Sequence, residues 1–327
     1  MRPTIGFGAA LALGIAATIA PPAEPAPTPE PAPSGVAAIA ARHDRALVAD
    51  LTAYIASDPK ADDIEQAYMT VFDKAIQHDW FAEHDAIARR YLDERPEGSV
   101  RPLAQIVATM ARAQAGRFDE AYAAFETLMA GVSGPEQQEF AVNFAENLAG
   151  SATTAGSYPV ARKVYESLRA KYPDDPNLLQ SVRDAIARLD KVGRAVPDVA
   201  GVDLAGAPIR LADLKGKYVL VDFWATWCAP CVAEIPRLQS AYAKYRARGF
   251  EIVAVSLDET KAPVLDFVAA RKIPWKQVHN AAGGADLVEA FGVTNIPATF
   301  LIDPSGTIIR LELRGPALDE ALAKLIK

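Results

Sequence analysis

The sequence predicts an all-α helical-repeat domain over residues 36–193, followed by an α/β domain with a mixed central sheet flanked by helices over residues 195–327. Three observations support this prediction. Apolar residues recur at three- and four-residue steps in the first part, as in helices, and strand-like apolar runs alternate with helical segments in the second. Between the two parts, the helical pattern is broken at residues 192–203, "VGRAVPDVAGVD", by glycine, proline and aspartate.

The first 20 residues resemble an export segment. Arg2 is followed by "TIGFGAALALGIAATIA", residues 4–20, which carries no charge. A basic start, an apolar stretch and small residues are typical of a cleaved signal peptide. The stretch is also at the lower limit for a membrane span, so a retained anchor that tethers the protein to a membrane is the alternative. Its weak hydrophobicity favours cleavage, and we expect a periplasmic or otherwise extracytoplasmic protein.

Residues 21–35, "PPAEPAPTPEPAPSG", are expected to form an extended Pro-rich linker. The remaining composition is globular, with 50% hydrophobic and 23% charged residues. The net charge of −7 provides no basic surface for nucleic acid. The four histidines are scattered without ligand spacing, so we expect surface residues and no metal site.

Two stretches 40 residues apart look alike in the helical part: "AGRFDEAYAAFETL" from Ala115 and "AGSYPVARKVYESL" from Ala155. Four prolines spaced 37, 39 and 38 residues apart mark expected helix starts: Pro59, Pro96, Pro135 and Pro173. This period is typical of paired-helix repeats. Residues 107–186 resemble the tetratricopeptide repeat family, which implies a concave surface for a protein or peptide partner. The alternative is an irregular helical bundle without a groove.

The α/β domain is predicted from its order of segments. We expect strands at 217–225 and 250–258, helices at 234–248 and 262–272, a hairpin over 298–313 with a turn at 303–306, and a terminal helix at 316–327.

Cys228 and Cys231 are the only cysteines, and they lie where the first long strand ends and its helix begins. A thiolate at a helix N-terminus has a lowered pKa and greater reactivity. Pro230 suits the first helical turn because it lacks an N–H group. A disulfide that closes so short a loop stabilises the fold little, and a metal site would need a second ligand pair. We therefore interpret the pair as a catalytic dithiol, with its own redox-active disulfide and no other cofactor.

The segments "GKYVLVDFWATWCAPCVAEIP", "IVAVSLD" and "FGVTNIPATFLIDPSG" resemble the thioredoxin superfamily, specifically the TlpA/ResA-like thiol-disulfide oxidoreductases. The resemblance implies the thioredoxin fold and thiol-disulfide exchange. It also implies a cis peptide at Ile296–Pro297 that faces the dithiol and lets the backbone of Ile296 pair with a substrate. Trp227 and Pro230 are expected to belong to this substrate-docking surface.

Two carboxylates are candidates for accepting the proton of Cys231. Asp222 lies in an apolar strand, where burial raises a carboxyl pKa. Thioredoxins carry an aspartate here, whereas TlpA/ResA-like sequences often carry asparagine. Glu234, three residues after Cys231, matches an acidic residue of the TlpA/ResA-like proteins. Ordinary first-turn stabilisation of a helix is the alternative role of Glu234.

Peroxiredoxins share this fold, but they need threonine or serine three residues before the reactive cysteine and proline four residues earlier. Those positions hold Ala225 and Val221, so a peroxidase is excluded. We expect an exported reductase of protein disulfides, supplied by a membrane electron donor of the DsbD/CcdA type. Apocytochrome c or a copper-site cysteine pair is the expected kind of substrate. A dithiol oxidant, and a partner-binding repeat protein whose redox site only senses or tethers, are the alternatives.

Overall fold

The computed structural model describes residues 35–134, 137–198, 200–280 and 286–327. The expected export segment and nearly all of the linker lie outside these residues. The chain divides into two compact units, Met1–Arg45 and Ala46–Lys327, and all packing described below lies within the second. In the ranges described, no helix is long and apolar enough to cross a membrane.

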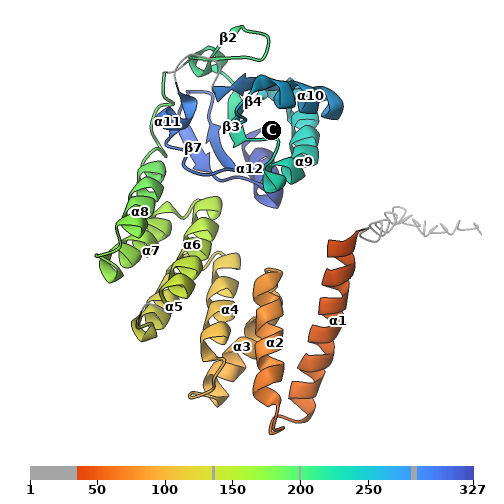
Figure 1. Cartoon of the computed structure of the whole chain (residues 1–327), viewed down its shortest axis with the longest axis vertical. Coiled ribbons are helices and arrows are strands. Elements are labelled where there is room, and N and C mark those ends of the chain that lie inside the picture. Colours follow the sequence, from red (N-terminus) through yellow and green to blue (C-terminus); the bar gives the residue numbers. More distant parts are fainter. Residues whose placement is uncertain (1–34, 135–136, 199, 281–285) are drawn as a thin grey trace, which may run out of the picture. The chain divides into compact units, whose positions relative to one another are not determined.

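The N-terminal part is helical, as predicted (Figure 1). Its helices are α1 (Val36–Ser57), α2 (Ile64–Gln77), α3 (Phe81–Glu94), α4 (Arg101–Gln114), α5 (Phe118–Gly131), α6 (Gln138–Ala155), α7 (Tyr158–Lys171) and α8 (Pro176–Leu189).

The two similar stretches occupy equivalent places, since α5 follows α4 and α7 follows α6 after a short turn. Gly116 and Gly156 form these turns with φ of 74° and 85°, which glycine adopts readily. Ala121 and Ala161 are fully buried, and a small side chain there lets neighbouring helices approach closely. Each of the two stretches thus forms the second helix of a helix pair, while the tetratricopeptide-like repeat and its partner-binding groove stay predictions.

The α/β part is built on a five-stranded sheet with the order β5-β4-β3-β6-β7. Its strands are β3 (Tyr218–Trp224), β4 (Phe250–Ser256), β5 (Lys276–His279), β6 (Ala298–Ile302) and β7 (Ile308–Leu311). The strands β3, β4 and β5 are parallel, β6 pairs antiparallel with β3, and β7 pairs antiparallel with β6, so the predicted mixed sheet is confirmed. A small antiparallel pair, β1 (Ala200–Val202) and β2 (Pro208–Arg210), precedes it.

Helices flank this sheet, as predicted (Figure 1). They are α9 (Ala229–Tyr245), α10 (Lys261–Arg271), α11 (Leu287–Phe291) and α12 (Gly315–Leu325), with short 3-10 turns η2 (Leu211–Leu214) and η3 (Arg246–Arg248). The predicted helix at 234–248 begins earlier, at Ala229. The strand β5 was not predicted, because a four-residue edge strand carries too little alternation.

Alternate residues of β3 point to opposite faces of the sheet. Leu220 and Trp224 pack in one apolar cluster with both cysteines and residues of α9 and α12. Val219, Val221 and Phe223 pack in the other cluster. Asp222 therefore belongs to the face that α9 covers, and this face holds the cysteines.

Candidate active site

A disulfide joins the two cysteines at the N-terminus of α9. The sulfur atoms are 2.07 Å apart and the Cα atoms 5.3 Å apart. Cys228 caps α9, and its Sγ accepts a hydrogen bond from the backbone N–H of Cys231, with 3.3 Å between sulfur and nitrogen. Pro230 occupies the first turn, where its missing N–H removes no helix bond. The helix dipole and the free N–H groups of this turn therefore favour negative charge on Cys228.

Both cysteine side chains are nearly buried, with 6% of Cys228 and 4% of Cys231 exposed. Trp227 beside them is 67% exposed. Trp224 is buried, and its indole N–H donates to Oε1 of Gln277 over 3.0 Å. The two tryptophans thus differ in role: Trp224 is part of the core, and Trp227 presents a large apolar surface to solvent next to the dithiol.

Asp222 is the buried carboxyl group on the dithiol face of the sheet. Burial raises its pKa to about 7, and the charges of Glu234 and Glu312 add to this, while Arg314 opposes it. A carboxyl group with this pKa changes between its protonated and ionised forms near neutral pH. It is therefore suited to accept and return a proton there.

Glu234 has a different environment. Its Oε2 accepts a hydrogen bond from the backbone N–H of Gly315 over 3.1 Å, at the first residue of α12. This contact fastens α9 to the start of α12. Its predicted role as a proton acceptor for Cys231 stays a prediction, and through its charge it also raises the pKa of Asp222.

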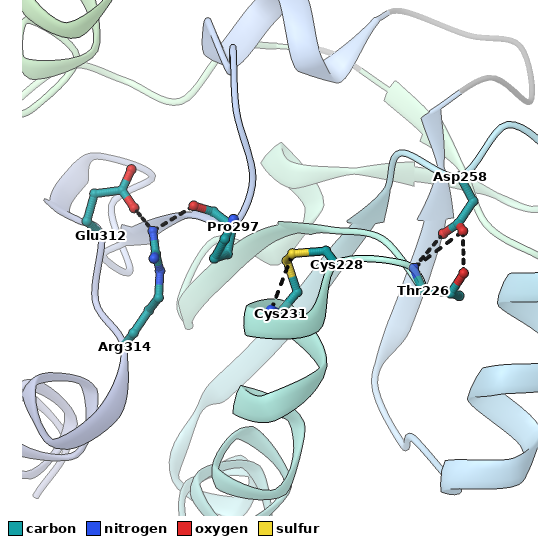
Figure 2. The surroundings of a disulfide bond; sticks show 7 residues. All are labelled: Thr226, Cys228, Cys231, Asp258, Pro297, Glu312 and Arg314. Carbon is teal, nitrogen blue, oxygen red and sulfur yellow. Dashed lines mark hydrogen bonds and ion pairs between the residues drawn. A yellow bond between two sulfur atoms is a disulfide. The ribbon is translucent and has the colours of Figure 1, made fainter. Parts of the chain in front are cut away.

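The Ile296–Pro297 peptide is cis, as the resemblance to thioredoxins implied. Figure 2 shows Pro297 beside the disulfide, with Arg314 on the other side of the proline. Nη2 of Arg314 donates to the carbonyl oxygen of Pro297 over 2.6 Å and also pairs with Glu312. Burial raises the pKa of Glu312, whereas the charges of Arg314 and Arg188 lower it. Sequence reasoning missed Arg314 and Glu312, because neither belongs to a motif.

A second missed group holds the loop before Cys228 (Figure 2). The buried carboxylate of Asp258 accepts from the backbone N–H and the Oγ1 of Thr226, and from Oγ of Ser256. The corresponding distances are 3.1, 2.5 and 2.8 Å. The position of Asp258 at the end of a buried strand was the available signal, since polar residues at such ends face loops of the same sheet edge.

His279 is buried near this group, and its Nε2 lies 2.8 Å from the carbonyl oxygen of Asp258. The expectation that the histidines are surface residues is therefore wrong for His279, and also for the buried His84. Both fill core positions, and their ring nitrogens lie at hydrogen-bond distance from backbone carbonyls. Within the part of the chain that the structure describes, no three His, Cys, Asp or Glu side chains are grouped to hold a metal ion.

Known proteins resemble the α/β part. Thiol-disulfide oxidoreductase ResA of Bacillus thuringiensis subsp. konkukian is 36% identical over 137 residues, which are 42% of this chain and 78% of that protein. The chain belongs to the ResA family of thiol-disulfide oxidoreductases. ResA of Bacillus subtilis is 35% identical over 119 residues, 36% of this chain and 65% of that protein.

A solved structure and a family model also match this chain. A crystal structure of the thioredoxin domain of a Bacteroides vulgatus thiol-disulfide oxidoreductase is 34% identical and covers 42% of this chain and 98% of its own, with a TM-score of 0.39. The AhpC/TSA family model matches residues 192–311. The fully buried Ala225 stands where a peroxidase needs a hydroxyl group, and the nearby hydroxyl of Thr226 already donates to Asp258.

Proposed function

We propose that this ResA-family oxidoreductase reduces protein disulfides, with Cys228 as the attacking thiol and Cys231 as the resolving thiol. The observation that carries the proposal is the position of the dithiol between a helix N-terminus and a buried carboxyl group. The N-terminus of α9 stabilises a thiolate on Cys228. The buried carboxyl group of Asp222, with a pKa of about 7, lies on the dithiol face of the sheet.

The proposed reaction has two exchange steps. The thiolate of Cys228 attacks one sulfur of the substrate disulfide, which forms a mixed disulfide and releases one substrate thiolate that takes up a proton. Cys231 then gives its proton to ionised Asp222, and its sulfur attacks Sγ of Cys228. The second substrate thiolate leaves, the internal disulfide forms, and two electrons have passed to the substrate.

The direction of the reaction is supported by the carboxylates. A dithiol becomes a strong oxidant when its reduced, ionised form is stabilised. The ionised carboxyl group of Asp222 on the dithiol face disfavours thiolates there, which opposes the stabilisation of Cys228 by the N-terminus of α9. The proposal takes the carboxylate effect to be the larger of the two, which favours the disulfide form of the protein and hence a reductant.

The export and supply of the enzyme are part of the same proposal. The uncharged stretch at residues 4–20 supports an extracytoplasmic, periplasmic location, through a cleaved signal peptide or an anchor. Outside the cytoplasm a dithiol needs a reductant, for which a membrane donor of the DsbD/CcdA type is proposed. Substrates of the cytochrome c maturation type, or a metal-site cysteine pair, are the proposed targets.

Reduction of insulin by the full chain, with dithiothreitol as electron source, tests the activity. We expect activity that Cys228→Ser abolishes, and a mixed disulfide with insulin that Cys231→Ser traps. A reduction potential near about −270 mV supports a reductase, whereas one near about −120 mV identifies an oxidant. Absence of both the activity and the trapped complex would leave the binding-protein alternative.

A further inference from the structure

A pocket of about 380 Å³ lies between the helical part and the segment that carries the cis proline. Tyr165 of α7 and Arg188 of α8 line one side, and Ile296, Pro297 and Arg314 line the other. Ile296 also packs against the apolar cluster that contains Cys228 and Cys231. The cis-proline segment, which is expected to pair with substrate, therefore lines the pocket and also lies beside the dithiol (Figure 2).

Hydrogen bonds hold the helical wall of the pocket against the sheet. The hydroxyl of Tyr158 accepts from the backbone N–H of Leu311 over 3.2 Å, and Nη2 of Arg310 donates to the carbonyl of Thr154 over 2.7 Å. These contacts satisfy polar groups of β7, which is the edge strand of the sheet. These hydrogen bonds therefore join the helical side of the pocket to β7.

Arg188 reaches the cis-proline segment directly. Its Nη1 donates to Oγ1 of Thr294 and Oδ1 of Asn295, both over 3.1 Å. Both acceptors are neutral. The charge of Arg188 also acts on Glu312, whose pKa it lowers, but among the residues described no carboxylate lies within salt-bridge distance of Arg188. Arg314, by contrast, is paired with Glu312. The charged side chains that line the pocket are these two arginines and Glu312, so the lining carries a net positive charge.

The second of the two similar stretches differs from the first at two aromatic residues on this side of the molecule. In the first repeat the position of Tyr165 is held by Phe125, which is fully buried. In the second repeat the equivalent ring is tyrosine, is partly exposed and lines the pocket. Tyr158 likewise stands where the first repeat has Phe118, and its hydroxyl contacts the edge strand. Both added hydroxyl groups lie in the repeat that contacts the α/β part.

We propose that this pocket binds an acidic side chain, aspartate or glutamate, that lies close to the disulfide of the substrate polypeptide, with Arg188 as its main partner. Charge-assisted hydrogen bonds from a guanidinium to a carboxylate are stronger than neutral ones. The proposal rests on the proposed function, since it concerns the substrate of that same dithiol. It assigns substrate selection in part to the helical domain.

The test uses short peptides, each with one intramolecular disulfide, in pairs that differ only by aspartate or asparagine at one position flanking a cysteine. We expect the best aspartate peptide to be reduced with a kcat/KM about ten-fold higher than its asparagine twin. In Arg188→Gln the ratio should fall to about one. Arg183→Gln is the matched control, because Arg183 lies on the same helix, is exposed and donates a hydrogen bond to its neighbour Gln180, away from the pocket lining.

A purely structural role of Arg188 would slow both peptides alike and leave the ratio unchanged, which would overturn the proposal. The proposal would also be overturned if the parent protein reduced the two peptides of every pair at equal rates. Peptide affinities for Cys228→Ser separate the two levels of inference. If the aspartate peptide binds preferentially but the parent protein does not reduce it, the proposed function is refuted and the pocket is upheld. If the peptides are reduced without any preference for aspartate, the proposed function is upheld and the pocket is refuted.

Discussion

Arg314 donates a hydrogen bond from Nη2 to the carbonyl oxygen of Pro297, over 2.6 Å, while its charge lowers the pKa of the buried Asp222. One side chain thus contacts the segment expected to bind substrate and also tunes the carboxyl group expected to accept a proton. This makes Arg314 a positioning residue with two measurable effects.

Replacement of Arg314 by glutamine should raise the pKa of Asp222 further above about 7, because the opposing positive charge is removed. We expect the pH midpoint of the resolving step to move upward by about one unit. The measurement is the rate at which Cys231 resolves a mixed disulfide on Cys228, as a function of pH. Arg237→Gln is the control, since Arg237 pairs with Asp319 on the exposed surface. An unshifted midpoint in Arg314→Gln would contradict the assignment.

Asp222→Asn should change stability in a pH-dependent way. The folded pKa of about 7 lies above the ordinary value of 3.8, so the folded state binds the proton more tightly and loses stability as pH rises between these values. Ionised Asp222 lowers the unfolding free energy by about 4 kcal/mol above pH 7 and has no such effect below pH 4. Urea unfolding should therefore find Asp222→Asn more stable than the parent at pH 8, with little difference at pH 4.

Asp303→Asn is a control of opposite sign. Partial burial favours the neutral form of Asp303, but hydrogen bonds from Ser305 and Thr307 lower its pKa overall. Its stabilising contribution is present above the unfolded pKa and is lost as pH falls, so Asp303→Asn should destabilise the protein at pH 8 and not at low pH. If Asp222→Asn also destabilises the protein at pH 8, the pKa of the Asp222 carboxyl group in the parent protein is not raised.

The loop before Cys228 should depend on Asp258. Thr226→Val removes the hydroxyl that donates to this buried carboxylate and should cost about 1–2 kcal/mol in unfolding free energy. Thr226→Ser keeps the hydroxyl and should stay near the parent. If the contact also positions Cys228, Thr226→Val will slow the first attack on a small disulfide, as measured by stopped-flow fluorescence. Equal attack rates for the two variants would limit Asp258 to a structural role.

The sequence predicted those features that depend on local chemistry. The buried strands β3 and β4, the cysteines at the start of α9 and the buried carboxyl group of Asp222 all follow from short-range patterns. Tyr158, Arg188, Arg310 and Arg314 could not be assigned in this way. Their contacts join residues distant in sequence or isolated from any motif, such as Tyr158 with Leu311. The contacts of α6 and α7 with β7, and of α8 with the segment at 294–295, bring Tyr158, Arg310 and Arg188 to their partners.

The same limit explains how the helical domain was interpreted. The repeat pattern predicts helix pairs and, by resemblance, a concave surface, but it contains no information on which repeat contacts the rest of the chain. The signal was present in the replacement of Phe118 and Phe125 by Tyr158 and Tyr165. Both pairs conserve an aromatic ring, so the pattern could not distinguish packing from hydrogen bonding.

Trp227 supplies the last prediction, since it is exposed and directly precedes Cys228. Trp227→Ala should change unfolding free energy by less than about 0.5 kcal/mol, because the ring packs little. It should lower kcat/KM for a protein disulfide by about ten-fold and leave reduction of a small aromatic disulfide unchanged, because exposed tryptophans contribute strongly to protein contacts. Trp224→Ala is the contrasting variant, since loss of a buried ring should cost about 3–5 kcal/mol. Equal slowing of both substrates by Trp227→Ala would instead place the ring in the exchange chemistry of Cys228.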